Sequence, residues 1–598
     1  MLHLKSFLVL AGIGFSFLTM HGNAQAQWSE PVIGPGARTQ SLADNPPPIT
    51  GATFHVSPTG NDANPGTAAA PWQHIRKAMQ DLQPGQAVLI HEGVYREGNL
   101  SPVGAGSGGT PGNYITFRAA PGETPEIDCT GSVFCLNHDN SISYIVYDGL
   151  EFYNSGQQIF LCNGSFGCDH IWFINGKYHD TGERDGRGFS ALGFFASSHN
   201  VVSNNEIYNF GTQAVGFVSG THDSITEFNN IHDGAYHLDD HHIIGSSGRS
   251  YGNVIRYNKV HDTYRRPNST NDCFQMTHVQ RNSCQGGTAI YVDVHQKEGG
   301  PSPTYVYNNI VWNNNAGFNF FNSDNVYVFN NIAYHNGFGP NCFFFTDTPP
   351  LGVYNESDII GSGSTCIPYR GMHGKGFNAE GNINRDEGNG NGNSNNRVYF
   401  FNNISFDNKN EGFVVGGQNV QVRNNISANN EAVEFKRAGS DGVIVDVFSH
   451  NLYFDSGGGT LVSPELLLRG ASNSSVNPQF VSPGTGDFNL QSGSPAVNAG
   501  TPIPHFNFDL NNTPRPQGPS WDIGSCEFTG TGVSGCRGGL PSGDGGGGPP
   551  PSSPCNQYTP STAIPAAFAS PFWVASNLSQ HLINVSCPPA TSASLTLG

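Results

Sequence analysis

A short block that opens with asparagine recurs along the middle of the chain and constrains its fold more than any other feature. Each block continues with an apolar residue and ends in a polar turn. Neighbouring blocks lie 22 to 28 residues apart, except for two longer steps of 51 and 72 residues that are close to two and three times the short step. About a dozen turns of this repeat fit the chain. The clearest copies are 204–211, 229–234, 257–262, 308–317, 330–337, 402–408 and 424–430.

This period predicts an all-β fold, a right-handed parallel β-helix (solenoid) with about three short strands in each coil. β-Branched and aromatic runs alternate with Asn/Gly turns, whereas the leucine consensus of leucine-rich repeats is missing. We expect the β-helix to span about 116–475. Asparagines at equivalent turns form hydrogen-bonded ladders and tolerate left-handed backbone, so we interpret most of them as structural.

The N-terminus predicts export. Residues 1–26 have a positive start at Lys5, an apolar core at 7–18 and a small-x-small cleavage site at 24–26, as a secretory signal peptide does. No other stretch is long and apolar enough for a membrane span, so we expect a secreted, extracellular protein, soluble or loosely held at a cell surface. The formal net charge of −19 argues against a nucleic-acid partner. We expect a monomer.

The 12 cysteines fall into close neighbours along the chain. Short loops are easy to close in an oxidising compartment, so this spacing predicts local disulfide bonds. The spacing templates of zinc sites are absent. The predicted pairs are Cys129/Cys135, Cys162/Cys168, Cys273/Cys284, Cys342/Cys366, Cys526/Cys536 and Cys555/Cys587.

Residues 54–97 combine a strand, a Gly/Asn/Pro loop, an amphipathic helix near 72–82 and a second strand. Together with the coils, over about 54–475, this segment resembles the pectate-lyase-like superfamily of right-handed parallel β-helices. The resemblance implies an N-terminal capping helix, because an open coil end would invite aggregation. It also implies an acidic polysaccharide as the partner, since such β-helices often cleave uronate polymers by β-elimination.

Residues 478–528 resemble a second family, the choice-of-anchor Q module that commonly follows such β-helices in exported bacterial proteins. The alternative is a polar lid on the last coil. We divide the chain into a signal peptide (1–26), an N-terminal cap with its first strands (27–115), the β-helix (116–475), the anchor-like module (476–530) and a Gly/Pro linker and tail (531–598). The matching residues are Phe488, Leu490, Gly493, Ser494, Pro495, Ala496, Gly500, Asp509, Arg515, Pro516, Asp522, Ile523, Gly524 and Glu527.

The densest polar cluster, 237–297, is the predicted active site. β-Elimination needs a cation on the uronate carboxylate and a base beside C5–H, and Ca²⁺ prefers the oxygen ligands that carboxylates supply. The alternative is a solvated turn held by local side-chain hydrogen bonds. The predicted catalytic residues are His242, Arg265, Arg266, His295 and Lys297, the substrate-binding residues Tyr291 and Arg249, and the Ca²⁺ ligands Asp239, Asp240 and Asp293.

Alignment of the strand runs predicts which side chains face outward. A second basic spot, Lys436–Arg437, is expected about six coils beyond Asp293, roughly 30 Å away by the strand spacing. The alignment places Ile243, Ile290, Phe318, Phe343 and Phe413 inward, and His242, Ile244, Tyr291, Asp293, Asn319, Phe321, Thr346, Glu434 and Lys436 outward.

Two rival functions remain open. A polygalacturonase-like hydrolase uses paired aspartates, and 238–247 is superficially similar to its motifs, although its Asn-Thr-Asp block is missing. A non-catalytic glycan-binding or surface β-helix would use a coil face lined by tyrosines, because fold does not fix function. These tyrosines are Tyr236, Tyr251, Tyr264 and Tyr291.

Overall fold

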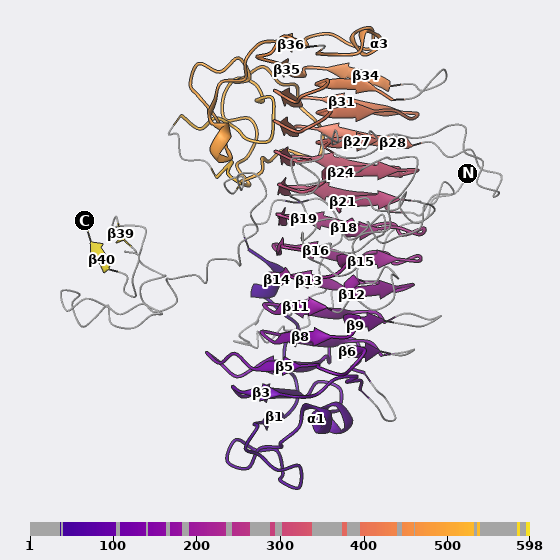
Figure 1. The fold of residues 1–598 in the computed structure, drawn as a ribbon, viewed down its shortest axis with the longest axis vertical. Coiled ribbons are helices and arrows are strands. Elements are labelled where there is room, and N and C mark those ends of the chain that lie inside the picture. The colour runs from indigo at the N-terminus through magenta and orange to yellow at the C-terminus, as the bar shows by residue number, and fades with distance from the viewer. Residues whose placement is uncertain are drawn as a thin grey trace, which may run out of the picture.

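The chain winds into three long parallel sheets, which confirms the predicted right-handed parallel β-helix (Figure 1). Strands that follow one another in the chain go to different sheets, and each strand pairs with its equivalent one coil later. The computed structural model describes residues 36, 40–102, 108–138, 142–162, 168–181, 190–234, 242–263, 287–293, 302–337, 374–379, 395–438, 445–459, 461–530, 535–538, 583–586 and 594–597.

Sheets 1 and 2 each contain 13 strands. Sheet 1 is β1 (Thr53–Val56), β2 (Ala87–Ile90), β4 (Ile115–Ala119), β7 (Ile145–Asp148), β10 (Ile171–Ile174), β13 (Val201–Ser203), β16 (Ile225–Glu227), β19 (Val254–Arg256), β22 (Thr304–Tyr307), β25 (Asp324–Phe329), β28 (Asn396–Phe401), β31 (Val420–Arg423) and β34 (Val445–Ser449). Sheet 2 is β3 (Val94–Tyr95), β5 (Glu126–Asp128), β8 (Glu151–Ser155), β11 (Lys177–Thr181), β14 (Glu206–Tyr208), β17 (Asn230–His232), β20 (Lys259–His261), β23 (Ile310–Trp312), β26 (Ile332–Tyr334), β29 (Ile404–Phe406), β32 (Ile426–Ala428), β35 (Leu452–Phe454) and β36 (Ser474–Ser475).

Sheet 3 contains ten strands and faces away from the corner that joins the other two. Inward side chains of all three sheets form one continuous apolar core. Sheet 3 is β6 (Phe134–His138), β9 (Gln158–Cys162), β12 (Ser190–Phe195), β15 (Gln213–Val218), β18 (His242–Ser246), β21 (Thr288–Asp293), β24 (Ala316–Phe321), β27 (Phe377–Ala379), β30 (Phe413–Val415) and β33 (Phe435–Arg437).

The corner between sheets 1 and 2 has the same length in every coil from β7 to β35, two residues. The first residue has a positive φ, for example 55° at Asn308 and 54° at Asn330. From Asn205 to Asn451 the second residue is a buried asparagine of a ladder in which Asn309 donates to Asn331 at 3.0 Å and Asn331 donates to Asn403 at 3.0 Å. The predicted asparagine ladder is therefore confirmed, and it accounts for the paired asparagines of the repeat.

The two long steps of the repeat hold one coil each, which corrects the expectation of two and three. β20 pairs directly with β23, and β26 pairs directly with β29. The additional residues lie in the chain before and after β21 and β27, both in sheet 3. Between β7 and β35 the longest connections all flank sheet 3 in the chain, and they are 262–287, 294–303, 335–376 and 380–395.

The N-terminal helix α1 (Ile75–Asp81) lies at the first coil and buries Ile75, Ala78 and Met79 in the central core (Figure 1). The short 3₁₀ helix η1 (Leu42–Asp44) packs on the outer face of sheet 1 instead, where the Leu42 amide donates to the buried Glu227. No described helix is long and apolar enough to cross a membrane. The predicted signal peptide lies outside the described residues.

The segment 476–530 packs beside the last coils (Figure 1). It contains β37 (Phe480–Ser482), η4 (Pro483–Thr485) and β38 (Asp487–Leu490), and α3 (Pro464–Leu467) precedes it. A separate hairpin, β39 (Ile583–Ser586) with β40 (Ser594–Leu597), lies near the C-terminus. The disulfides Cys129–Cys135, Cys162–Cys168 and Cys526–Cys536 confirm three of the predicted pairs, and the other three lie outside the described residues.

Candidate functional site

Two columns of outward side chains run along sheet 3. The printed register and the backbone bonds from Gly317 to Lys375 and from Gly376 to Glu411 place equivalent residues one above another. The first column is Gln158, Ser190, Gln213, His242, Thr288, Ala316, Lys375 and Glu411, and the second is Gly193, Gly216, Gly245, Tyr291, Asn319, Asn378, Val414 and Lys436.

Near the middle of this face, two predicted site residues lie together on the neighbouring strands β18 and β21. The rings of His242 and Tyr291 are stacked with 3.3 Å between centroids and an angle of 7° between planes. On the strands before Tyr291, the second column consists of Gly193, Gly216 and Gly245, because polar side chains of the first column lie over these positions. A Cβ on Gly245 would approach Gln213 Nε2 to 2.2 Å, so the Gln213 side chain would have to move to accommodate one.

The part of this face from β24 to β33 is rich in amide and charged groups. Lys436 Nζ lies 2.5 Å from Glu411 Oε1, while the buried Glu411 Oε2 has no hydrogen-bond partner among the described residues. Asn378 donates to Asn319 at 3.1 Å and accepts from Lys375 Nζ at 3.4 Å. Lys375 is 4% exposed and Glu411 5% exposed. Buried charges need partners, so this end of the face is a polar site rather than ordinary surface.

The other predicted site residues are partly separated from His242 and Tyr291. Asp293 ends β21 and is two residues beyond Tyr291, on the same side of the strand. Arg249 is exposed in the turn after β18, at the opposite end of that strand from His242, with φ of 69°. The remaining predicted residues, Asp239, Asp240, Arg265, Arg266, His295 and Lys297, lie outside the described residues.

The predicted alignment needs four corrections, of which Glu434 is the last. Ile243 and Ile244 are both core residues, so Ile244 does not face outward. Phe377 pairs with Phe318 in the position assigned to Phe343, which lies outside the described residues, as does Thr346. Lys436 lies four strands beyond Asp293, about 19 Å by the strand spacing, because the long connection around β27 holds one coil.

Glu434, expected to face outward, is 1% exposed. Burial raises its pKa to about 7, against hydrogen bonds from Ser427 and Asn430 that lower it. A second asparagine ladder lies at the corner between sheets 2 and 3 and consists of Asn314, Asn336, Asn408 and Asn430. Glu434 ends this ladder and accepts a hydrogen bond from the Asn430 backbone amide at 3.0 Å. Its partners assign it a role in that ladder.

Sequence reasoning missed Lys375, Asn378 and Glu411. A sequence pattern that could have revealed this strand was present, because Gly317–Phe318–Asn319 recurs as Gly376–Phe377–Asn378. The long connection before it hid the repeat from a search at fixed spacing.

A second outward row, on sheet 2, stacks rings instead of exposing them. Tyr153, His179, Tyr208, His232 and His261 follow one another with centroids 4.5 to 5.5 Å apart. Burial alone lowers the pKa of His179, but hydrogen bonds and charges of Asp180 and Glu151 outweigh it and raise the pKa to about 9. The row is therefore a charged structural stack.

His232 has the same environment two coils further along. Its ring lies 2.8 Å from Asp233 and 3.5 Å from Glu206. Burial lowers its pKa, whereas the hydrogen bonds of Asp233 and Glu206 raise it to about 9. Both imidazoles are protonated at neutral pH.

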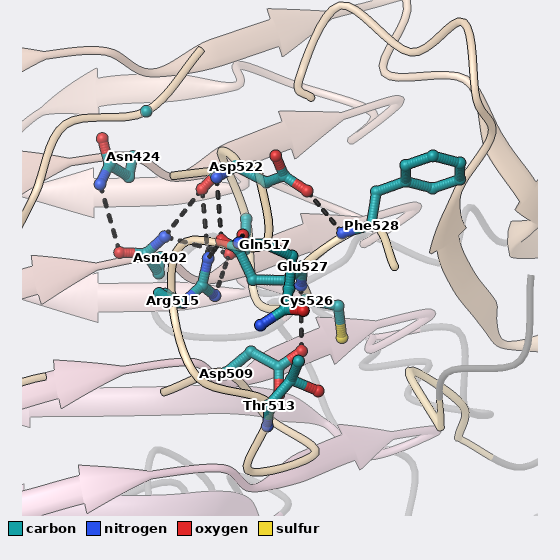
Figure 2. Close-up of polar contacts among 12 residues, drawn as sticks. Asn402, Asn424, Asp509, Thr513, Arg515, Gln517, Asp522, Cys526, Glu527 and Phe528 are labelled. Atoms are coloured by element: carbon teal, nitrogen blue, oxygen red, sulfur yellow. Dashed lines mark hydrogen bonds and ion pairs between the residues drawn. The ribbon is translucent and has the colours of Figure 1, made fainter. Parts of the chain in front are cut away.

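A deeply buried ion pair lies within segment 476–530, and Arg515 also donates to Asn330 Oδ1 of the coils at 3.3 Å. Arg515 Nη1 lies 2.6 Å from Glu527 Oε1, and Arg515 Nη2 donates to Gly524 O at 2.8 Å (Figure 2). Asn402 at a coil corner donates to the carbonyls of Asp522 and Gly524. Burial and the Glu527 charge raise the pKa of Asp522 to about 6, against backbone hydrogen bonds to its carboxylate. Every charge in this cluster has protein partners, so its role is docking.

Within the described ranges, no group of three or more His, Cys, Asp or Glu side chains is placed to hold a metal ion. Of the predicted Ca²⁺ ligands, only Asp293 is described. It offers one carboxylate at the edge of the sheet 3 face, where Ca²⁺ takes six to eight oxygen ligands. The calcium site stays a prediction.

No family model and no curated protein matches this chain. Among solved structures, pectate lyase Pel9A is 15% identical and matches 80% of this chain and 97% of its own, with a TM-score of 0.40. XylC in complex with xylose is 12% identical over 80% of this chain and 99% of its own, with a TM-score of 0.47. A rhamnogalacturonan lyase is 14% identical over 72% of this chain and 91% of its own, with a TM-score of 0.32. These likenesses are of fold.

Proposed function

We propose that this chain is an exported glycan-active β-helix protein that binds a polysaccharide along the outer face of sheet 3. The observation that carries the proposal is the one-sidedness of the coil. The corner between sheets 1 and 2 keeps two residues from β7 onward, whereas the long connections flank sheet 3. Insertions on one flank of a solenoid are where binding faces usually lie.

The finer proposal is a lyase that cleaves a uronate polymer by β-elimination. On the described face, the half-exposed Lys436 supplies a cation for a carboxylate, and His242 supplies an imidazole. Such groups match the two needs of the reaction, charge stabilisation and a base. Ca²⁺ belongs to the proposal because a chain of net charge −19 would otherwise repel a polyanion. When bound, Ca²⁺ would neutralise the uronate carboxylate.

Purified protein is incubated with pectate, alginate and neutral glycans, with and without a chelator. Elimination produces unsaturated uronate ends that absorb in the ultraviolet, and we expect this signal on an acidic polymer and its loss with chelator. Reducing ends without ultraviolet absorbance would identify a hydrolase instead. Binding without either product would identify a glycan-binding scaffold.

Four substitutions place the site on the face. We expect His242→Ala, Asp293→Ala, Glu411→Gln and Lys436→Gln each to lower the rate at least tenfold, while Lys259→Gln on sheet 2 leaves it unchanged. Unchanged rates in all four variants would place the chemistry elsewhere.

The similarity of residues 478–528 to an anchor module remains part of the proposal, and a cell-fractionation experiment with and without 476–598 tests it.

A further inference from the structure

The outward row of sheet 2 lacks a ring at one strand. From β8 to β35 each strand presents an aromatic or imidazole ring at the equivalent position, except β32, which presents Ala428. Phe406 and Phe454 lie on either side of it, one strand before and one after. The strand spacing therefore puts these two positions about 9.6 Å apart.

A recess of about 240 Å³ opens at this position, between the last coils and segment 476–530. Its walls include Phe406, Ala428 and Phe454 from sheet 2, and Phe480 from the C-terminal segment. Phe480 stands at 82° to Phe406, with 6.1 Å between centroids. The apolar lining thus comes from ring carbons on more than one side.

The polar part of the lining consists of amides. Asn429, Gln479 and Gln491 line the recess, and no residue of its lining is charged. Gln491 is tied to Phe480 O at 2.8 Å, and Asn429 accepts from Ser456 at 3.0 Å. The exposed side chain of Gln479 makes no hydrogen bond among the described residues. An amide offers both donors and an acceptor, as sugar hydroxyls require.

We infer that this recess binds one neutral pyranose residue of a glycan. Aromatic carbons accept the C–H faces of a sugar ring, and the amides bind its hydroxyls. The volume is below the range of drug-sized sites, so a single ring is the unit that fits. A uronate or sulfated sugar would lack a cation in the lining. The recess lies on sheet 2 and is independent of the cleavage proposed for sheet 3.

Saturation-transfer NMR on the full chain tests this site. The probes are the methyl β-glycosides of glucose, galactose and xylose, with glucuronate and galacturonate as charged counterparts. We expect at least one neutral glycoside to bind with a Kd on the order of 1 mM, the usual range for a site of a few contacts. Uronates should bind at least tenfold more weakly.

Two variants locate the binding. Gln479→Gly removes the amide and suits the positive φ of 51° at that residue, and Phe454→Ala removes one wall. Both should weaken binding at least tenfold. Asn419→Gly is the matched control, because Asn419 is an exposed amide with φ of 55° outside the recess, and it should bind as the wild type does.

Thermal unfolding of each variant checks the fold, and if Phe454→Ala is unstable, Gln479→Gly carries the test. Absence of neutral-sugar binding to the wild type overturns the inference, as does equal binding of uronates or unchanged binding in Gln479→Gly. Because the ultraviolet assay for cleavage reports on sheet 3, failure of either proposal is seen separately.

Discussion

His179 and His232 are the residues whose charge matters most for the described coils. Each imidazole lies between two carboxylates, and each has a pKa of about 9 against 6.5 in an unfolded chain. A raised pKa means that the folded state holds the proton more tightly. The stabilisation is complete below pH 6.5 and is lost as the pH rises through about 9.

Stability should therefore fall between about pH 6.5 and 9, by up to a few kcal/mol for the two groups together, since one pKa unit corresponds to about 1.4 kcal/mol. Thermal unfolding measured from pH 6 to 10 should show a declining Tm in the wild type. The double variant His179→Gln with His232→Gln should show a lower Tm at pH 6 and a flatter profile. Parallel profiles would show that the imidazoles do not titrate as described.

Asn331 tests the buried ladder at the same scale. Its side chain donates to Val306 O and Asn403 and accepts from Asn309. Asn331→Ala leaves several buried polar groups unpaired, at a cost of about 2–4 kcal/mol. We expect a Tm lower by several degrees, measured by circular dichroism. Asn396→Ala, which loses one surface hydrogen bond, is the control and should change Tm little.

At the scale of elements, the segment 476–530 depends on one buried ion pair. Arg515 and Glu527 are at most 1% exposed at the side chain. Breaking such a pair leaves an uncompensated charge and costs about 3–5 kcal/mol, whereas replacing both partners is much less costly. Arg515→Met should therefore expose backbone amides of 476–530 to hydrogen exchange.

The double variant Arg515→Met with Glu527→Gln should recover part of that protection. Exchange is followed by mass spectrometry, with the amides of β10 as internal reference. Equal protection in Arg515→Met and the wild type would mean that the apolar contacts of Phe488 and Leu490 hold the segment without the ion pair.

Sequence reasoning succeeded where the chemistry is local and periodic. The left-handed corner position and the inward asparagine each favour one residue type at a fixed offset. The pairs Asn308–Asn309 and Asn330–Asn331 therefore indicate the corner geometry from the sequence alone. Close cysteines are equally local. Side-chain direction at Ile243–Ile244 was harder, because both residues face the core and a strict alternation assigns one of them outward.

The candidate site could be predicted only in part, for a different reason. Lys375 and Glu411 come together through a sheet that pairs residues 36 positions apart, whereas the neighbouring coil is 59 positions away. No fixed period finds both steps. His242 and Tyr291 were assigned outward positions because both lie in strands with recognisable apolar neighbours, whereas the stacking of their rings was not predicted.

At the scale of the whole molecule, the length of the polar face on sheet 3 can be tested with ligands of different lengths. From β18 to β33 there are five strand steps, about 24 Å. On the proposed function, affinity for oligosaccharides of the polymer should rise with chain length until the ligand spans the face and then level off. Calorimetric titration of a length series measures this. Equal affinity for a monosaccharide and a long oligomer would mean that one short subsite does all the binding.

The constant two-residue corner has a consequence for how such a molecule can change. Because stacking is secured at the corner between sheets 1 and 2, the connections that precede and follow the strands of sheet 3 in the chain can lengthen, shorten or be exchanged without altering how coils follow one another. On the proposed function, a lineage built on this coil is free to acquire new glycan preferences by exchanging those segments alone. A segment transplanted from another β-helix into 338–373 should accordingly leave the coil folded and alter only what it recognises.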